Sequence, residues 1–219
     1  MENHPRRQPI QQWDIYPITS LELANGRSYP EIAEAMLEGG ARVIQLRDKQ
    51  TDFHDLVKAG RDMARIVRDS GAQLIVNDNP YLAKEIGADG VHLGQTDCPV
   101  DIARDILGPN KLIGLSTHTI HQALRAQMLP NVDYIGWGPI FATETKPGAN
   151  EPLGLDGVAW AARNLKIAFV CIGGINAENI ESLAQRGAKI CAAVSAVMQN
   201  EDITASTRKL RQMLTGDQE

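Results

Sequence analysis

The sequence predicts a single-domain (β/α)8 barrel of the TIM type, and three observations support this fold class. The chain has 219 residues, a length that suits one domain of this size class. Short apolar runs alternate eight times with helical patterns, without a change in composition along the chain. A helix ending in Gly, then Ala, then a strand recurs at 39–46, 86–93 and 186–193. A doubly wound open sheet is the alternative, but no GxGxxG follows the first strand, which weakens its dinucleotide-binding version.

The first half of the chain supplies four strand–helix pairs. Short apolar runs predict strands over 14–18, 42–46, 74–76 and 90–93. Helical spacing of apolar residues and flanking Gly or Pro predict helices over 30–37, 52–68, 80–86 and 99–107. Pro80 suits the first turn of its helix, where the missing N–H costs nothing, and Gly87 suits the helix end.

The second half repeats the alternation. Strands are expected over 111–115, 133–136, 167–172 and 189–194, and helices over 119–129, 155–164, 177–185 and 204–214. A Gly- and Pro-rich connection separates the sixth strand from its helix, and its 138–154 stretch is a candidate lid because it exceeds the usual loop length. We expect residues 1–12 to form a flexible tail and residues 13–219 to form the catalytic barrel.

Composition narrows the classes of partner. Hydrophobic and charged contents of 43% and 22% are ordinary for a globular protein, and a net charge of −5 argues against nucleic acid or an anionic membrane as partner. Cys98, Cys171 and Cys191 are widely spaced, so we expect small buried residues in a reducing cytosol. Residues 1–14 lack a secretion signal and no apolar run is long enough to span a bilayer. We expect a cytoplasmic protein acting on small molecules, and a homo-oligomer is compatible with the sequence.

Polar side chains gather at one end of the predicted strands. In this fold the active site lies at the carboxyl ends of the strands. The residues that follow those ends are Gln45, Arg47, Lys49, Asn77, Asp78, Gln95, Asp97, Ser116, His118, Thr143, Thr145, Lys146, Gly173, Gly174, Val194 and Ser195. The opposite ends are mostly Gly, Ala and Pro. This asymmetry predicts an enzyme.

Each of these residues also has a structural reading. Asp78, Asn79 and Asp97 lie just before helices and could act only as N-caps. Arg47 and Lys49 could be solvated loop charges, and His92, inside a strand, is expected to pack or hydrogen-bond there. Their convergence on one rim favours function, because neighbouring parallel strands lie about 4.8 Å apart and bring the two aspartates to one site.

The charges at this rim suit a magnesium–diphosphate group better than an acid–base pair. Mg²⁺ prefers one or two carboxylates together with phosphate oxygens, which fits Asp78 and Asp97. Cations aimed at the same mouth would neutralise charge on a departing diphosphate: Arg47, Lys49 and Lys146. Gly173-Gly174 and the helix start after Val194-Ser195 suggest a second anion site, as is usual for loops seven and eight of this fold. The sequence shows no credible nucleophile–base–acid triad.

Six segments closely resemble the thiamine-phosphate synthase family, from about Asp14 to Val197. They are QLRDK (45–49), NDNPYLAKEIGADGVHLGQTD (77–97), IGLSTHT (113–119), DYIGWGPIFATETK (133–146), IGGI (172–175) and AVSAV (193–197). The resemblance implies a (β/α)8 barrel that joins hydroxymethylpyrimidine diphosphate to a phosphoethyl-thiazole or its carboxylate, with Mg²⁺ required. The products implied are thiamine phosphate and pyrophosphate, plus CO2 from the carboxylate. Diphosphate departure would leave a pyrimidinylmethyl cation that the thiazole nitrogen captures.

The resemblance also assigns roles to individual residues. It places the metal on Asp78 and Asp97. It places the pyrimidine diphosphate on Gln45, Arg47, Lys49, Asn77, Ser116 and Lys146, with the catalytic roles on Arg47, Lys49, Ser116 and Lys146. It places the thiazole phosphate on Thr143, Thr145, Gly174, Val194 and Ser195. The chain departs from the usual family pattern at Trp137, Ala142 and Lys189, which bears on lid stiffness and local packing.

Three other functions are compatible with parts of this pattern. A related thiazole tautomerase resembles the family in fold but lacks its diphosphate-binding set. A phosphate-sugar lyase would need Lys49 or Lys146 as a Schiff base with a lowered pKa in a desolvated site, whereas both lie among predicted phosphate-binding residues. A non-catalytic barrel that binds thiamine precursors would not need the metal and cation set.

Overall fold

The barrel prediction is confirmed in the computed structural model, which describes residues 5–143 and 150–217. Its strands are β1 Ile15–Pro17, β2 Val43–Leu46, β3 Gln73–Asn77, β4 Gly90–Leu93, β5 Leu112–Thr117, β6 Tyr134–Trp137, β7 Ala168–Cys171 and β8 Ile190–Ala193. They form one parallel sheet in the order β1-β8-β7-β6-β5-β4-β3-β2. A parallel bridge between Ile18 and Gln45 brings β1 beside β2, so the sheet nearly closes on itself. This order excludes the doubly wound alternative.

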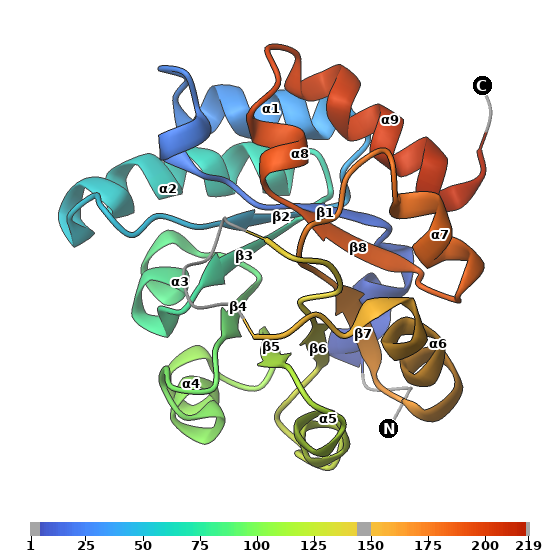
Figure 1. The fold of residues 1–219 in the computed structure, drawn as a ribbon. Coiled ribbons are helices and arrows are strands. Elements are labelled where there is room, and N and C mark those ends of the chain that lie inside the picture. Colours follow the sequence, from blue (N-terminus) through green and yellow to red (C-terminus); the bar gives the residue numbers. More distant parts are fainter. Residues whose placement is uncertain (1–4, 144–149, 218–219) are drawn as a thin grey trace.

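Helices surround the ring of strands (Figure 1). They are α1 Tyr29–Glu38, α2 Phe53–Asp69, α3 Pro80–Ile86, α4 Val100–Leu107, α5 Ile120–Ala126, α6 Gly154–Asn164, α7 Ile180–Gln185, α8 Ser195–Met198 and α9 Ile203–Thr215. The four-residue α8 begins at Ser195, where the sequence suggested a helix start, and Val194 separates it from β8. None of the helices in the described part of the chain is long and apolar enough to cross a membrane.

Local signals set the helix ends as the sequence predicts. Asn79 caps α3, its side chain accepting hydrogen bonds from the N–H groups of Tyr81 and Leu82, and Pro80 occupies the first turn. Gly87 ends α3 with φ 75°, in the left-handed region that glycine adopts without strain. These caps fix where β3 and β4 end, and therefore where the polar residues after them lie.

The core has two parts, one between the strands and the helices and one inside the barrel. Cys171 and Cys191 are buried in the outer part, as expected, while Cys98 is half-buried. The interior part includes Tyr16, Tyr134 and Trp13, and the Trp13 ring meets those of Tyr16 and Tyr134 edge-on with centroids 5.4 and 5.1 Å apart.

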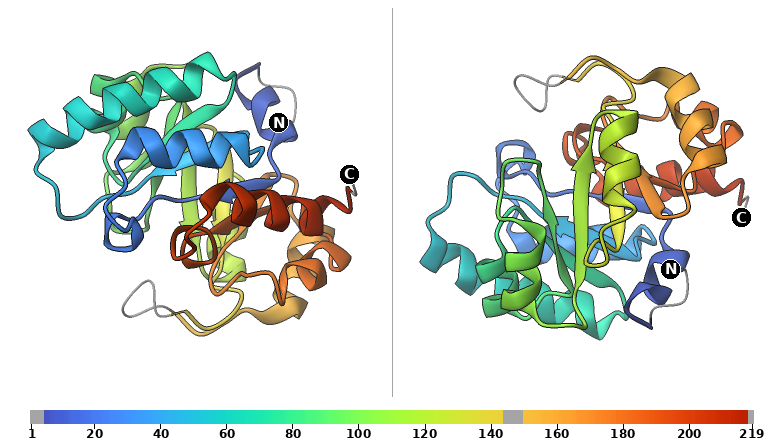
Figure 2. Two further views of the ribbon diagram at one scale, coloured as in Figure 1. Left: turned by 90° about the horizontal axis from the view of Figure 1, so that it is seen from above. Right: turned by 90° about the horizontal axis from the view of Figure 1, so that it is seen from below.

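The N-terminal segment closes one end of the barrel. The 3-10 helix η1, Pro5–Gln12, lies at the opposite end from the coloured segments that flank residues 144–149 (Figure 2). Ile10 is only 3% exposed because it joins the interior cluster. An apolar residue thus packs the second half of the segment expected as a tail against the barrel interior.

Aspartates that precede the strands at this end, the lower end of the barrel, join neighbouring elements. Asp89 accepts a hydrogen bond from Leu74 N–H at 2.9 Å. Asp133 accepts one from Ile113 N–H and pairs with the guanidinium of Arg104, both at 3.0 Å. Each carboxylate thus links its own strand to the preceding one. They act as structural residues.

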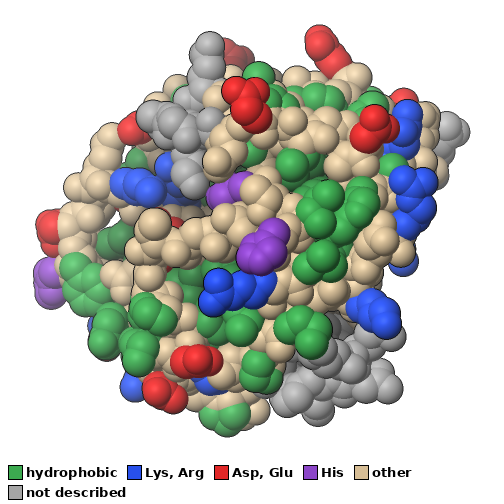
Figure 3. Space-filling model, turned by 60° about the horizontal axis from the view of Figure 1, so that its bottom comes forward, with side chains coloured by type: hydrophobic (Ala, Val, Ile, Leu, Met, Phe, Trp, Pro, Cys, Tyr) green, Lys and Arg blue, Asp and Glu red, His purple; other side chains and the backbone are tan. Residues whose placement is uncertain are grey.

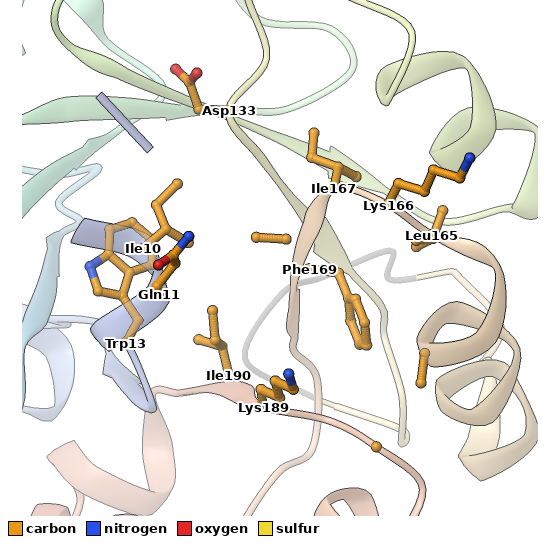
Figure 4. A pocket seen from close by; sticks show the side chains of 13 residues that line it. Ile10, Gln11, Trp13, Asp133, Leu165, Lys166, Ile167, Phe169, Lys189 and Ile190 are labelled. Atoms are coloured by element: carbon orange, nitrogen blue, oxygen red, sulfur yellow. The ribbon is translucent and has the colours of Figure 1, made fainter. Parts of the chain in front are cut away.

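The equivalent position before β8 is Lys189, whose side-chain ammonium cannot accept a hydrogen bond. The registered β7–β8 pairs are Val170↔Ile190 and Cys171↔Cys191, which would place Phe169 opposite Lys189. A cavity of about 620 Å³ opens at this seam, with Trp13 and Ile190 among its lining residues (Figure 4). The departure at Lys189 thus coincides with a gap low in the barrel wall.

Candidate active site

Two carboxylates face each other at the carboxyl ends of the strands, which form the upper end of the barrel. Asp78 follows β3, where its N–H donates to His92 O at 2.8 Å and its φ is 62°, a left-handed conformation that Asp tolerates better than most residues. Asp97 follows β4 and is held by Gly94 N–H, which donates to its Oδ2 at 2.7 Å. Lys49 Nζ lies 3.4 Å from Asp78 Oδ2. The structure therefore brings together the two predicted metal ligands and one predicted cation.

The electrostatics of this pair favour a bound cation. Burial raises the pKa of Asp78 above its ordinary value, and the hydrogen bond and charge of Asp97 raise it further, while Lys49 opposes both. A divalent ion between the carboxylates would relieve their repulsion. The described residues contain no group of three or more His, Cys, Asp or Glu side chains suited to a metal. Two carboxylates completed by water and phosphate oxygens are the arrangement that suits Mg²⁺.

The loop after β2 is fixed from two sides. Thr19 Oγ1 accepts from Arg47 N–H at 2.9 Å and donates to Arg47 O at 3.1 Å. Asp48 accepts from Gln50 N–H at 2.7 Å and from the hydroxyl of Tyr29. This loop places Arg47 and Lys49 on the wall of a cavity of about 790 Å³.

The same cavity reaches the loops after β6, β7 and β8. Its wall includes three residues predicted to hold the thiazole phosphate: Thr143, Gly174 and Ser195. Gly174 has φ 64°, and a Cβ there would lie 2.5 Å from Ala142 O, so only glycine fits. Phe141 N–H donates to Gly173 O at 3.0 Å, which ties the start of the β6 loop to the β7 loop. Val194 packs against the interior cluster and precedes α8.

Gln45 and Ser116 lie deeper, inside the barrel. Gln45 is 4% exposed and its Nε2 donates to Tyr16 Oη at 3.1 Å. Ser116 Oγ lies 2.9 Å from His92 Nε2, so His92 hydrogen-bonds within the sheet as expected. Asn77 ends β3 in register with His92. Sequence reasoning missed Tyr16; its inward position on β1 is visible only once the strand pairing is known.

Two further predicted residues and part of the candidate lid cannot be placed. Thr145 and Lys146 lie outside the described residues. The lid at 138–154 is described only over 138–143 and 150–154, so its closure stays a prediction. On the face shown in Figure 3 the blue Lys and Arg side chains are scattered among side chains of other types.

The family model and the curated relatives agree with each other. A family model described as thiamine monophosphate synthase matches residues 15–197. A thiamine-phosphate synthase of Chloroflexus aurantiacus is 42% identical over 210 residues, covering 96% of each chain. One from Methanocella arvoryzae is 40% identical over 204 residues, covering 93% of this chain and 96% of the relative.

A solved structure agrees with the sequence matches. Thiamine phosphate pyrophosphorylase from Pyrococcus furiosus superposes with a TM-score of 0.84 at 32% identity, covering 96% of this chain and 98% of that one. The family match spans the strands from β1 to β8 and the junctions that form the cavity. The chain belongs to the thiamine monophosphate synthase family.

Proposed function

We propose that this protein is a Mg²⁺-dependent thiamine-phosphate synthase that joins hydroxymethylpyrimidine diphosphate to phosphoethyl-thiazole or its carboxylate. The observation that carries the proposal is the facing pair Asp78 and Asp97 with Lys49 beside it. Arg47 and Lys49 line the same cavity as Gly174 and Ser195, which supports a proposal that puts two phosphorylated groups in one space. This arrangement suits one substrate with a diphosphate and another with a monophosphate.

The diphosphate half of the site would work through charge. Asp78 and Asp97 would hold Mg²⁺, which when bound neutralises the diphosphate and makes it a better leaving group. Arg47, Lys49 and Lys146 would contact the diphosphate oxygens, where negative charge grows as the carbon–oxygen bond breaks. Asn77, Ser116 and Gln45 would orient the pyrimidine diphosphate.

The thiazole half of the site would hold its phosphate through small residues and hydroxyls. The residues proposed to bind it are Thr143, Thr145, Gly174, Val194 and Ser195. The carbon–oxygen bond breaks first and its electron pair leaves with the diphosphate oxygen. The thiazole nitrogen then captures the pyrimidinylmethyl cation with its lone pair, which forms the new carbon–nitrogen bond. No proton is removed from the nucleophile, so this step needs no general base. With the carboxylated thiazole, CO2 also leaves. We place this reaction in the cytoplasm.

Turnover with both substrates tests the proposal. Thiamine phosphate should form with Mg²⁺ and fail to form after chelation. Asp78→Ala and Asp97→Ala should each fold normally but lose most turnover. Asp105→Ala, on the exposed surface of α4, is the matched control and should keep parent turnover. Near-normal rates in either site variant at limiting Mg²⁺ would contradict the metal assignment, and binding of both substrates without product would contradict catalysis.

A further inference from the structure

Five polar side chains form a hydrogen-bonded chain across the barrel interior. Gln45 Nε2 lies 3.1 Å from Tyr16 Oη, which lies 3.0 Å from Tyr134 Oη. Tyr134 Oη is 3.2 Å from His92 Nδ1, and His92 Nε2 is 2.9 Å from Ser116 Oγ. The chain links five strands and ends on Gln45 and Ser116, two residues proposed to contact the pyrimidine substrate. Its middle members are absent from the proposed site.

Two strand glycines make room for this chain. A Cβ at Gly114 would lie 2.3 Å from the Tyr134 ring and 2.5 Å from His92 Nδ1. A Cβ at Gly136 would lie 3.1 Å from the His92 ring. Glycine weakens a strand interior and often marks a close approach of neighbouring groups. Here it lets His92 and Tyr134 meet, so the contact is built into the sheet.

The chain has a direction, because each phenol has one proton to donate. The Gln45 amide nitrogen can only donate, so the Tyr16 hydroxyl accepts from it; when the Tyr16 hydroxyl also uses its own proton, Tyr134 Oη, 3.0 Å away, receives it. Tyr134 then donates to His92 Nδ1, and a neutral imidazole that accepts at Nδ1 carries its proton on Nε2. In this direction His92 donates from Nε2 to Ser116 Oγ, 2.9 Å away.

Burial keeps both phenols protonated. It raises the pKa of Tyr16 and the pKa of Tyr134 above their ordinary values; a buried phenolate would be poorly solvated. The opposite direction would start with the Gln45 oxygen accepting from Tyr16 and would end with Ser116 donating to His92. In that case the hydroxyl proton of Ser116 would lie in the hydrogen bond to His92 and could not be donated to the substrate.

We infer that His92 is a positioning residue that makes Ser116 a hydrogen-bond donor to the pyrimidine diphosphate, with Tyr134 fixing the His92 tautomer. The inference rests on the proposed function. With its oxygen accepting from His92, Ser116 directs its proton to the substrate. A donor aimed at oxygens that gain charge stabilises the transition state more than the ground state.

Tyr134→Phe is the first test, because it removes one hydroxyl and keeps the buried ring. We expect kcat to fall about tenfold with KM for the pyrimidine diphosphate little changed, the size expected for one hydrogen bond to a charged group. Tyr81→Phe, at an exposed tyrosine, is the matched control and should leave kcat unchanged. A folded Tyr134→Phe enzyme with parent kcat would overturn the inference.

A double-mutant cycle separates positioning from general packing. In a Ser116→Ala background, Tyr134→Phe should cause no further loss of kcat, because the group that it positions is already gone. Additive losses would mean that Tyr134 acts elsewhere. His92→Gln, which keeps an N–H for Ser116, should retain more activity than His92→Leu at comparable thermal stability; equal losses would overturn the role of the donor.

The tautomer can be read directly. Nitrogen-15 NMR of the His92 ring in the parent should show the proton on Nε2, and Tyr134→Phe should give a mixture of tautomers. A proton on Nδ1 in the parent would overturn the inference. A parent enzyme that makes no thiamine phosphate refutes the proposed function. An active parent in which the losses of kcat from Tyr134→Phe and Ser116→Ala are additive refutes only the positioning role of His92 and Tyr134.

Discussion

The two ends of this barrel use aspartate in opposite ways. At the lower end Asp133 is 1% exposed, yet it accepts from a backbone N–H and a guanidinium. At the upper end Asp78 faces Asp97, and burial together with that neighbour raises the pKa of Asp78. The buried Asp133 is matched by donors from neighbouring strands and helices, whereas the partly buried Asp78 faces a second carboxylate and has only Lys49 beside it to offset the charge. A carboxylate whose negative charge is not fully balanced by protein donors or cations indicates a site for a positively charged ligand.

Substitution of an aspartate at the lower end should therefore lower the stability of the fold and leave turnover nearly unchanged. Asp133→Ala removes the carboxylate partner of buried Arg104 and the acceptor for Ile113 N–H. We expect the free energy of unfolding to fall by about 3–5 kcal/mol, the usual cost of breaking a buried ion pair, with kcat of the folded enzyme nearly unchanged. Urea unfolding and turnover at low temperature measure the two quantities. A loss below about 1 kcal/mol would mean that Arg104 is satisfied by its carbonyl partners alone.

At the contact between β7 and β8 a carboxylate can be added instead of removed. Lys189→Asp should restore a carboxylate opposite Phe169 N–H, as Asp89 and Asp133 provide at other seams. We expect a gain of about 0.5–1.5 kcal/mol, the net worth of one hydrogen bond, seen as a higher urea midpoint. Lys166→Asp makes the same charge change beside the same cavity and is the control. Equal shifts in the two variants would show that charge alone is responsible.

The smallest effect is expected at the upper end, in the dependence of stability on pH. The folded-state pKa of Asp78 is raised, so the folded protein holds this proton more tightly and loses stability as pH rises through the raised pKa. Without divalent metal, Asp78→Asn should be more stable than the parent at pH 7 and lose this advantage at about pH 3, below the ordinary pKa of Asp. The Asp78 side chain is 34% exposed, so water limits the gain.

Chemical unfolding at both pH values checks this result. Mg²⁺ should stabilise the parent more than the variant, because the ion binds the folded site. A variant less stable than the parent in chelator at pH 7 would mean that Lys49 outweighs the repulsion between the carboxylates.

Much of the site follows from local sequence. The short apolar runs, the Asn79 cap with Pro80 and the glycine at 87 predicted where β3 and β4 end, within about a residue or two. Once these ends are known, parallel pairing places Asp78 and Asp97 at one rim. Local signals suffice here because helix caps and alternation depend on neighbours in the chain.

Other features depend on residues far apart in the sequence. Tyr16 and Tyr134 are 118 positions apart, and their contact requires both the inward register of each strand and the near closure of the sheet. Ile10 anchors η1 for the same reason: the interior that it enters exists only after the strands have assembled. The four-residue α8 is too short for a periodic signal.

The sequence by itself determined the eightfold alternation, the rim that gathers charge and the family, because these rest on local patterns and on motifs that are contiguous in the chain. Only the tertiary structure decided which carboxylates have donors, which face each other and how the polar chain crosses the interior. Those properties depend on burial and on distances between strands, and neither is fixed until the barrel forms.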